Sequence, residues 1–277
     1  MGVMLQSGCI RSVWSAWTGE SPTALVMTAL LLLILTAPVL LGGAKRIANA
    51  ASRIVPFMTV GYLLCCCWIL HRFRADLPRV IGEIFSSAFG VRAIGGAALG
   101  TLLRETVLSG VQRGLFSNEA GLGLGAITAA SVEENDAERM GDLGLLVTFL
   151  DTFVICLASG LCILVTRSEG DGSLLLQGWR EGIPWAGELA PAALSLFLTL
   201  FALTSIYGVG FGAESALRYL GRVKWLNGYR LVSAAAVVIG YFLPQELFWH
   251  TADALNAALA ILNLPALFFA AKGESSS

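Results

Sequence analysis

Charged residues are scarce in this sequence: Asp, Glu, Lys and Arg make up 13% of its 277 residues, whereas hydrophobic residues make up 56%. A soluble globular domain carries about 25% charged residues, so this chain has too little polar surface to cover itself in water. The spare apolar surface must face lipid. The composition therefore excludes an ordinary water-soluble domain and indicates an all-α integral membrane protein.

Excess positive charge, histidine pairs and disulfide spacing are also missing. The formal net charge is −1, whereas a nucleic-acid partner would need a basic stripe. The two histidines, His71 and His250, are far apart in sequence and give no transition-metal spacing. Three of the six cysteines, residues 65–67, are consecutive in an apolar run and cannot easily bridge one another. We therefore expect no nucleic-acid partner, no transition metal and no organic cofactor.

Long apolar runs are what the sequence has in abundance. A membrane-spanning helix needs about 20 predominantly apolar residues. Six stretches between charged segments approach or exceed this length: 22–43, 54–70, 143–166, 191–213, 231–249 and 252–271.

The region 80–132 has a less regular pattern. Residues 81–92 look amphipathic, and 93–103 resemble a helix broken by glycines. Cytoplasmic loops are enriched in Lys and Arg, which places the loops 45–53 and 214–230 inside the cell and demands an odd number of crossings between 80 and 132. We expect a surface helix followed by one broken crossing. The chain then forms a single transmembrane domain, 1–277, with about seven crossings.

The stretch "GVQRGLFSNEAGLG", residues 110–123, places Asn118 and Glu119 beside Gly121 and Gly123. Each glycine weakens a helix by roughly 1 kcal/mol relative to alanine. Unwound backbone at membrane depth occurs only where protein buries it or where it lines a watery cavity, and such discontinuous helices form the binding sites of secondary transporters. The alternative is a motif at the membrane edge, whose glycines let helices pack closely.

Other polar residues lie inside the apolar runs. A charge such as Asp151 costs about 2.5–3.5 kcal/mol at the centre of a spanning helix and is a functional hypothesis by default. Its role is either a gate or a helix-packing hydrogen bond. Thr204 and Ser205 offer hydroxyl oxygens suited to a hard cation such as Na⁺, although such residues also pack helices. Asn256, with Asp253 and Asn263, is similarly ambiguous in the last helix.

An intramembrane enzyme is a competing hypothesis. The stretch "LASG", residues 157–160, contains a possible serine nucleophile. A nucleophile needs a partner base, and no histidine lies in a convincing membrane position. We therefore do not expect an enzyme.

The motif at 110–123 closely resembles the signature of the alanine or glycine:cation symporter family, the sodium:alanine symporters. Further stretches resemble family segments in the same order, so that the resemblance covers nearly the whole chain. They are "GGAKRIANAASRIVPFMTVGYLL" (42–64), "DTFVICLASGLCIL" (151–164), "FALTSIYGVGFGAESALRYL" (201–220) and "TADALNAALAILNLPAL" (251–267).

The resemblance implies secondary active symport of a small neutral amino acid, alanine or glycine, with Na⁺ or H⁺ in a bacterial inner membrane. It also implies the five-plus-five inverted-repeat fold typified by leucine transporters, here only in part. Residues 22–70 would be the last two helices of the first repeat, and 80–271 the second repeat. The implied substrate contacts are Asn118, Glu119, Gly121, Gly123, Ser205 and Val209. Thr204 and Ser205 would bind the cation, and Asp151 and Asn256 would serve gating or packing.

The sequence departs from the family pattern in several places. The family's earlier broken helix, with its G-T-G-N-I-A-G-V-type stretch, has no counterpart here. We therefore expect an incomplete chain whose missing N-terminal half is encoded separately or lost, or else a non-transporting remnant or membrane partner protein. Smaller departures are Val209 in place of a tryptophan, Ser205 in place of a threonine, and Leu262, Asn263 and Leu264 in place of P-N-L.

Overall fold

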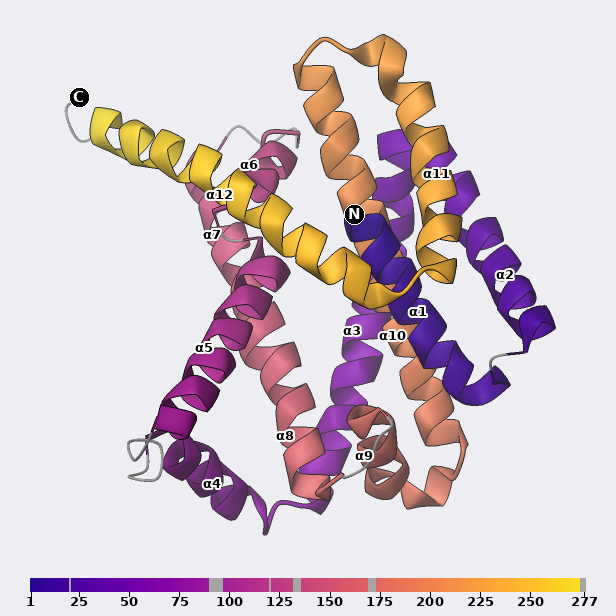
Figure 1. The fold of residues 1–277 in the computed structure, drawn as a ribbon, viewed down its shortest axis with the longest axis vertical. Helices are drawn as coiled ribbons and strands as arrows, with labels where there is room; N and C mark the ends of the chain where they lie inside the picture. The colour runs from indigo at the N-terminus through magenta and orange to yellow at the C-terminus, as the bar shows by residue number, and fades with distance from the viewer. Residues whose placement is uncertain (20, 90–96, 120, 132–135, 169–172, 275–277) are drawn as a thin grey trace. The chain divides into compact units, whose positions relative to one another are not determined.

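The computed structural model describes residues 1–19, 21–89, 97–119, 121–131, 136–168 and 173–274. Within these ranges the chain is helical and contains no strand (Figure 1). The helices are α1 (Gly2–Thr18), α2 (Pro22–Leu41), α3 (Gly43–Arg72), α4 (Leu77–Phe89), α5 (Ala97–Asn118), α6 (Leu124–Ala129), α7 (Ala137–Phe149), α8 (Leu157–Thr166), α9 (Leu174–Gly182), α10 (Leu189–Tyr219), α11 (Leu226–Phe242) and α12 (Gln245–Glu274). A π-helical segment, η2 (Leu150–Cys156), joins α7 to α8, and short 3₁₀ turns η3 (Pro184–Ala186) and η4 (Val223–Trp225) precede α10 and α11.

The chain divides into two compact units. Unit 1 contains residues 1–59, 121–137 and 195–277, and unit 2 contains residues 60–120 and 138–194. The long helices α3 and α10 each contribute to both units.

The core of unit 1 joins α1, α2, α3, α10 and α11. Buried apolar side chains from all five helices form one cluster: Val3, Ile10, Ala29, Leu32, Leu40, Ile47, Ala202, Leu203, Ile206, Tyr207, Val237 and Tyr241. Helix α1 packs on α11, α12 and α2, and α11 packs on α2 (Figure 1). The short helix α1 is not expected from hydropathy, because Arg11 and polar residues interrupt it. Its inward side chains nevertheless recur at helical spacing, as Val3, Ser7, Ile10 and Trp14 show.

Two polar features fix the ends of the unit 1 helices. Ser21 caps α2, since its Oγ accepts a hydrogen bond from the Ala24 amide at 3.3 Å, and Pro22 occupies the first turn, where no donor is lost. Farther along, the buried carboxylate of Glu214 on α10 forms two hydrogen bonds with Arg230 on α11, from Nε at 2.8 Å and from Nη2 at 2.9 Å. The Ala44 amide at the start of α3 donates to the same carboxylate at 3.3 Å.

The core of unit 2 lies where α3, α8 and α9 meet. Tyr62 stacks on Trp179 with ring centroids 5.5 Å apart, and its hydroxyl lies 2.6 Å from Ser159 Oγ. Cys66 and Cys162 are fully buried beside them as small apolar groups. Helix α9 approaches α3 closely because it presents Gly182, where a Cβ would lie 2.7 Å from the Ile69 side chain.

Five described helical stretches are long and apolar enough to cross a membrane: Pro22–Leu41, Gly43–Arg72, Ala137–Thr166, Leu189–Tyr219 and Leu247–Phe269. Two of the seven expected crossings are not among them. The broken crossing is divided between α5 and α6, and α11 has only 17 residues.

Several expected boundaries are wrong. The expected span 231–249 runs across the end of α11, because Leu243 is extended before Pro244 and a residue before proline disfavours helix. The basic stretch 45–53, expected as a loop, is helical and belongs to α3. The amphipathic stretch 81–92, expected as a surface helix, is helical up to Phe89 as part of α4. Its residues 90–92 lie outside the described part of the chain, as do residues 93–96 of the expected glycine-broken helix.

Candidate functional site

The glycine motif interrupts the helix that carries it. Helix α5 ends at Asn118 and α6 begins at Leu124, with the described residues between them in a turn. Three residues here have left-handed backbone angles: Glu119 with φ 50°, Gly121 with φ 74° and Gly123 with φ 83°. Glycine adopts positive φ without steric cost, whereas other residues do so rarely. The glycines therefore permit the interruption, and Glu119 is held in a conformation that its side chain disfavours.

In unit 2, the end of α5 is tied to the π-helical segment. Ser117 Oγ donates to Asp151 Oδ2 at 2.6 Å, and Thr152 Oγ1 donates to Asn118 Oδ1 at 2.9 Å. The segment η2 has a wide turn with one extra residue. Its consecutive polar residues Asp151 and Thr152 both contact the end of α5. Asp151 and Asn118 are thus brought into one polar cluster, and π-segments of this kind are frequent at functional sites.

In unit 1, the glycine side of the interruption contacts α12. Asn263 Nδ2 donates to the Gly121 carbonyl at 3.0 Å, and a Cβ added to Gly123 would lie 2.9 Å from Asn263 Oδ1. A Cβ on Gly121 would lie 3.0 Å from the Leu264 side chain. The sequence pattern led us to assign a role to Asn256 on this helix and none to Asn263. The available signal was its place in the segment that resembles the family's P-N-L.

The other candidate residues of unit 1 lie on α10 and α12. Thr204 Oγ1 donates to backbone carbonyls of its own helix, Leu200 at 3.0 Å and Phe201 at 2.9 Å, and lies near Met58 Sδ on α3. Ser205 is half-buried on the next position of α10. Val209 packs against the unit 1 core, and a Cβ on Gly2 would lie 3.2 Å from it. Asn256 is half-buried on α12.

The candidate residues are divided between the units. Asn118, Glu119 and Asp151 belong to unit 2. The remaining candidates belong to unit 1: Gly121, Gly123, Thr204, Ser205, Val209 and Asn256.

Neither a metal cluster nor an activated nucleophile is formed by the described residues. No group of three His, Cys, Asp or Glu side chains in these ranges comes together as a metal site would require. Ser159 Oγ donates to the Ile155 carbonyl at 2.6 Å and adjoins the Tyr62 hydroxyl. This serine is held by its own helix and by a neutral phenol, an arrangement that supplies no general base.

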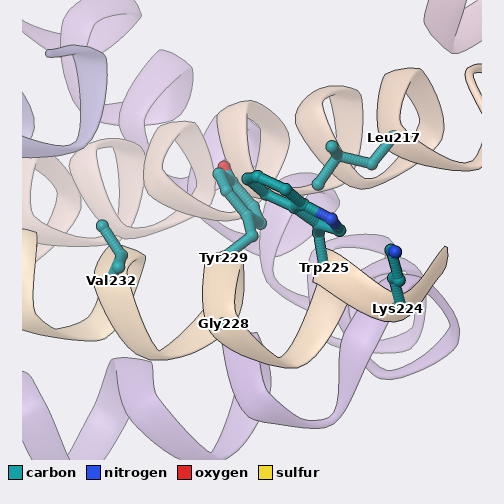
Figure 2. A pocket seen from close by; sticks show the side chains of 6 residues that line it. All are labelled: Leu217, Lys224, Trp225, Gly228, Tyr229 and Val232. Carbon is teal, nitrogen blue, oxygen red and sulfur yellow. The ribbon is translucent and has the colours of Figure 1, made fainter. Parts of the chain in front are cut away.

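A cavity of about 610 Å³ opens in the α10–α11 hairpin of unit 1, lined by Leu217, Lys224, Trp225, Gly228, Tyr229 and Val232 (Figure 2). Figure 2 shows the rings of Trp225 and Tyr229 pointing toward the helix that carries Leu217. Lys224 is the one charged group in the lining, whereas an amino acid needs partners for both its ammonium and its carboxylate. Aromatic and basic side chains at the end of a spanning helix are typical of the membrane–water interface. The cavity therefore does not suit a small amino acid.

A family model, the sodium:alanine symporter family, matches residues 1–274 of the chain. The chain belongs to this family. Among similar proteins, a sodium/alanine symporter, AgcS, of Methanococcus maripaludis is 33% identical over 272 residues, which cover 95% of this chain and 58% of that protein. An uncharacterized transporter of Haemophilus influenzae is 33% identical over 247 residues, covering 87% of this chain and 54% of its own. The amino-acid carrier protein AlsT of Bacillus subtilis is 30% identical over 266 residues, which cover 95% of this chain and 56% of that protein.

This member of the sodium:alanine symporter family thus spans a little over half the length of these relatives. The matched region contains the interrupted helix, the π-segment and the α12 asparagine that contacts the glycines. Membership in this family, together with five apolar helices, identifies a multi-pass membrane protein.

Proposed function

We propose that this chain takes part in secondary active symport of a small neutral amino acid, alanine or glycine, coupled to Na⁺. Coupling to H⁺ is the second possibility for the ion. The observation that carries the proposal is the interruption between α5 and α6, with positive φ at Glu119, Gly121 and Gly123, in a chain of the sodium:alanine symporter family. Interrupted helices offer free backbone groups to substrate and ion at membrane depth.

The chemistry of the interruption suits a zwitterion and a cation. The last carbonyls of α5, a helix of 22 residues, have no partner within the helix and carry its negative dipole end. Asp151 adds a carboxylate beside Ser117 at the same end. Asn118, Glu119 and the peptide groups at Gly121 and Gly123 would then meet the amino acid.

The remaining roles follow from side-chain chemistry. Thr204 uses its proton toward its own helix, so its oxygen lone pairs remain available to a cation, and Ser205 would add a second hydroxyl toward cation or substrate. Val209 would limit the size of the substrate. Asp151 and Asn256 would hold or gate the helices that move.

The proposed fold is the second part of a five-plus-five inverted repeat. Helices α2 and α3 would be the last two of the first repeat, and the region from α4 to α12 the second repeat. Transport would proceed by rocking of one helix bundle against another in a bacterial inner membrane.

The test is binding and uptake of radiolabelled alanine by the purified chain, in nanodiscs and proteoliposomes, with Na⁺ or with choline. We expect Na⁺-stimulated binding that Gly123→Ala weakens by about tenfold, because an alanine with positive φ costs about 1–2 kcal/mol. Gly125→Ala is the matched control, since Gly125 lies in α6 with open space at its Cβ position, and it should bind as the wild type does.

Failure of the wild-type chain to bind or take up alanine or glycine with Na⁺ or at an imposed pH gradient would contradict the proposal. A membrane-inserted, folded chain without either activity would instead favour the role of a membrane partner protein.

A further inference from the structure

Asn263 contacts both glycines at the helix interruption. Its amide nitrogen donates to the Gly121 carbonyl at 3.0 Å, and its amide oxygen occupies the space beside Gly123 that a Cβ would enter at 2.9 Å. The next residue, Leu264, contacts Gly121 in the same way, with its Cδ2 3.0 Å from the position of a Cβ. Two consecutive residues of α12 thus cover the two glycines with left-handed backbone angles.

The hydrogen bond to Gly121 replaces a bond that a continuous helix would have made. A carbonyl released from the helical ladder in an apolar environment must find another partner, because an unsatisfied buried polar group costs about 1–3 kcal/mol. Asn263 supplies that partner from another helix. The glycine turn therefore depends on α12 as well as on its own backbone freedom.

Asn256 provides an internal comparison on the same helix. It is the same residue type, lies seven positions earlier and hence on nearly the same face of α12, and is half-buried as Asn263 is. It forms no hydrogen bond with the part of the chain that the structure describes, whereas Asn263 forms one with the interruption. A general need for asparagine in a membrane helix would not distinguish the two.

We infer that Asn263 is a positioning residue, which fixes the turn at Gly121–Gly123 and thereby sets the affinity of the interrupted helix for its amino acid. It acts through the backbone and does not touch the substrate. The link to affinity rests on the function proposed above, whereas the hold on the turn stands on the contacts of Asn263 alone.

Two measurements on the purified chain in nanodiscs test the inference: hydrogen exchange of the peptide covering residues 116–128, and the Kd for labelled alanine with Na⁺. The variants are Asn263→Ala, Asn263→Leu and, as a control on the same helix, Thr251→Ala, since the Thr251 hydroxyl donates to the Leu247 carbonyl of its own helix at 2.9 Å. Unchanged exchange in the unit 1 core peptides of α1 and α11 shows that each variant is folded. Leucine has about the shape of asparagine but neither a donor nor a charge, so it separates the hydrogen bond from packing.

We expect Asn263→Ala and Asn263→Leu to speed exchange in 116–128 by roughly three- to tenfold, the equivalent of one net hydrogen bond, and to raise the Kd by a similar factor. Thr251→Ala should change neither quantity. Unchanged exchange in both Asn263 variants, wild-type behaviour of Asn263→Leu, or faster exchange with an unchanged Kd would each overturn the inference. If the wild type binds no alanine, the proposed function fails, and the exchange data still decide whether Asn263 holds the turn.

Discussion

At the scale of single residues, Glu214 is the clearest case of a charge that depends on its partners. It is 1% exposed, and its two oxygens receive hydrogen bonds from the Arg230 guanidinium and the Ala44 amide. The hydrogen bonds between Arg230 and Glu214 raise the pKa of Arg230, so the arginine stays charged. Arg230 Nη1 also donates to the Leu41 carbonyl at 3.4 Å, so that the pair joins the α2–α3 junction to α10 and α11.

Glu214→Gln should therefore destabilise the protein by roughly 3 kcal/mol, because it leaves the guanidinium of Arg230, whose side chain is 16% exposed, without its charged partner. The measurement is thermal unfolding of the purified protein in detergent. Replacing both partners, as Glu214→Leu with Arg230→Met, should recover much of the loss. Arg180→Ala is the control, since the Arg180–Glu188 pair is exposed and should contribute less than about 1 kcal/mol. Equal melting temperatures for Glu214→Gln and Arg180→Ala would rule out this account.

At the scale of helices, the crossing of α1 and α11 depends on a single glycine. A Cβ at Gly240 would lie 2.7 Å from Met4 Cβ and 2.5 Å from Ser7 Oγ. The two helices approach this closely because α11 presents a glycine at the crossing, and small residues are the usual device for close packing of helices in membranes. Gly228, on the same helix α11, has open space in the same position.

Substitution by alanine should thus have opposite effects at the two glycines of α11. Gly240→Ala should destabilise by about 1–3 kcal/mol through overpacking. Gly228→Ala should stabilise by about 0.5–1 kcal/mol, because alanine is the better helix former. Thermal unfolding of the two variants side by side gives the comparison, and a loss of stability of the same size at both positions would show that the crossing does not depend on Gly240.

Much of the helical organisation could be predicted from hydropathy, but its boundaries could not. The spans at 22–43, 143–166 and 191–213 correspond to α2, the α7–η2–α8 helix and α10, because each is a long apolar run. The glycines also indicated the interruption after Asn118. Helix α1 was missed because its stability comes from packing of one face. The basic start of α3 was missed because Lys and Arg favour helix as readily as they favour solvent.

The sequence predicts individual residues of the candidate site within each helix, but not the contacts between helices. The residues of the glycine motif and Asp151 stand out because polar groups are costly in apolar runs. How these residues pair does not follow from the sequence, since Ser117 meets Asp151, and Asn263 meets Gly121, through contacts between segments distant in sequence. No spacing rule in one sequence identifies which of two asparagines on α12 reaches the glycines.

At the scale of the whole molecule, apolar surface dominates the helices that can span a bilayer. The apolar windows of Ala137–Thr166 and Leu247–Phe269 are each only 6% buried, and that of Pro22–Leu41 is 22% buried. Contiguous exposed apolar surface on this scale is rare in soluble monomers and marks contact with lipid or protein. The net charge of −1 offers little repulsion against association in water.

The chain should consequently remain in the membrane pellet of expressing cells after an alkaline carbonate wash and be released by detergent. The expectation follows from burial of several apolar helices in the bilayer, which far exceeds what a surface helix or a lipid anchor supplies. Immunoblotting of the pellet and the supernatant is the measurement, with a peripheral membrane protein as the released control. Recovery of the chain in the carbonate supernatant would be incompatible with a multi-pass protein.

The π-helical segment at Leu150–Cys156 changes the direction in which side chains point along the helix that runs from Ala137 to Thr166. One residue of an α-helix corresponds to a rotation of about 100°. The extra residue in the wide turn therefore offsets the residues after it by about that angle from where a continuous α-helix of the same sequence would place them. This rotation lets Asp151 and Thr152 face the end of α5 while Ser159 and Cys162 face Tyr62 and Cys66. A fully α-helical segment of the same length would turn the residues after it by about 100° and could satisfy only one of these two faces at a time.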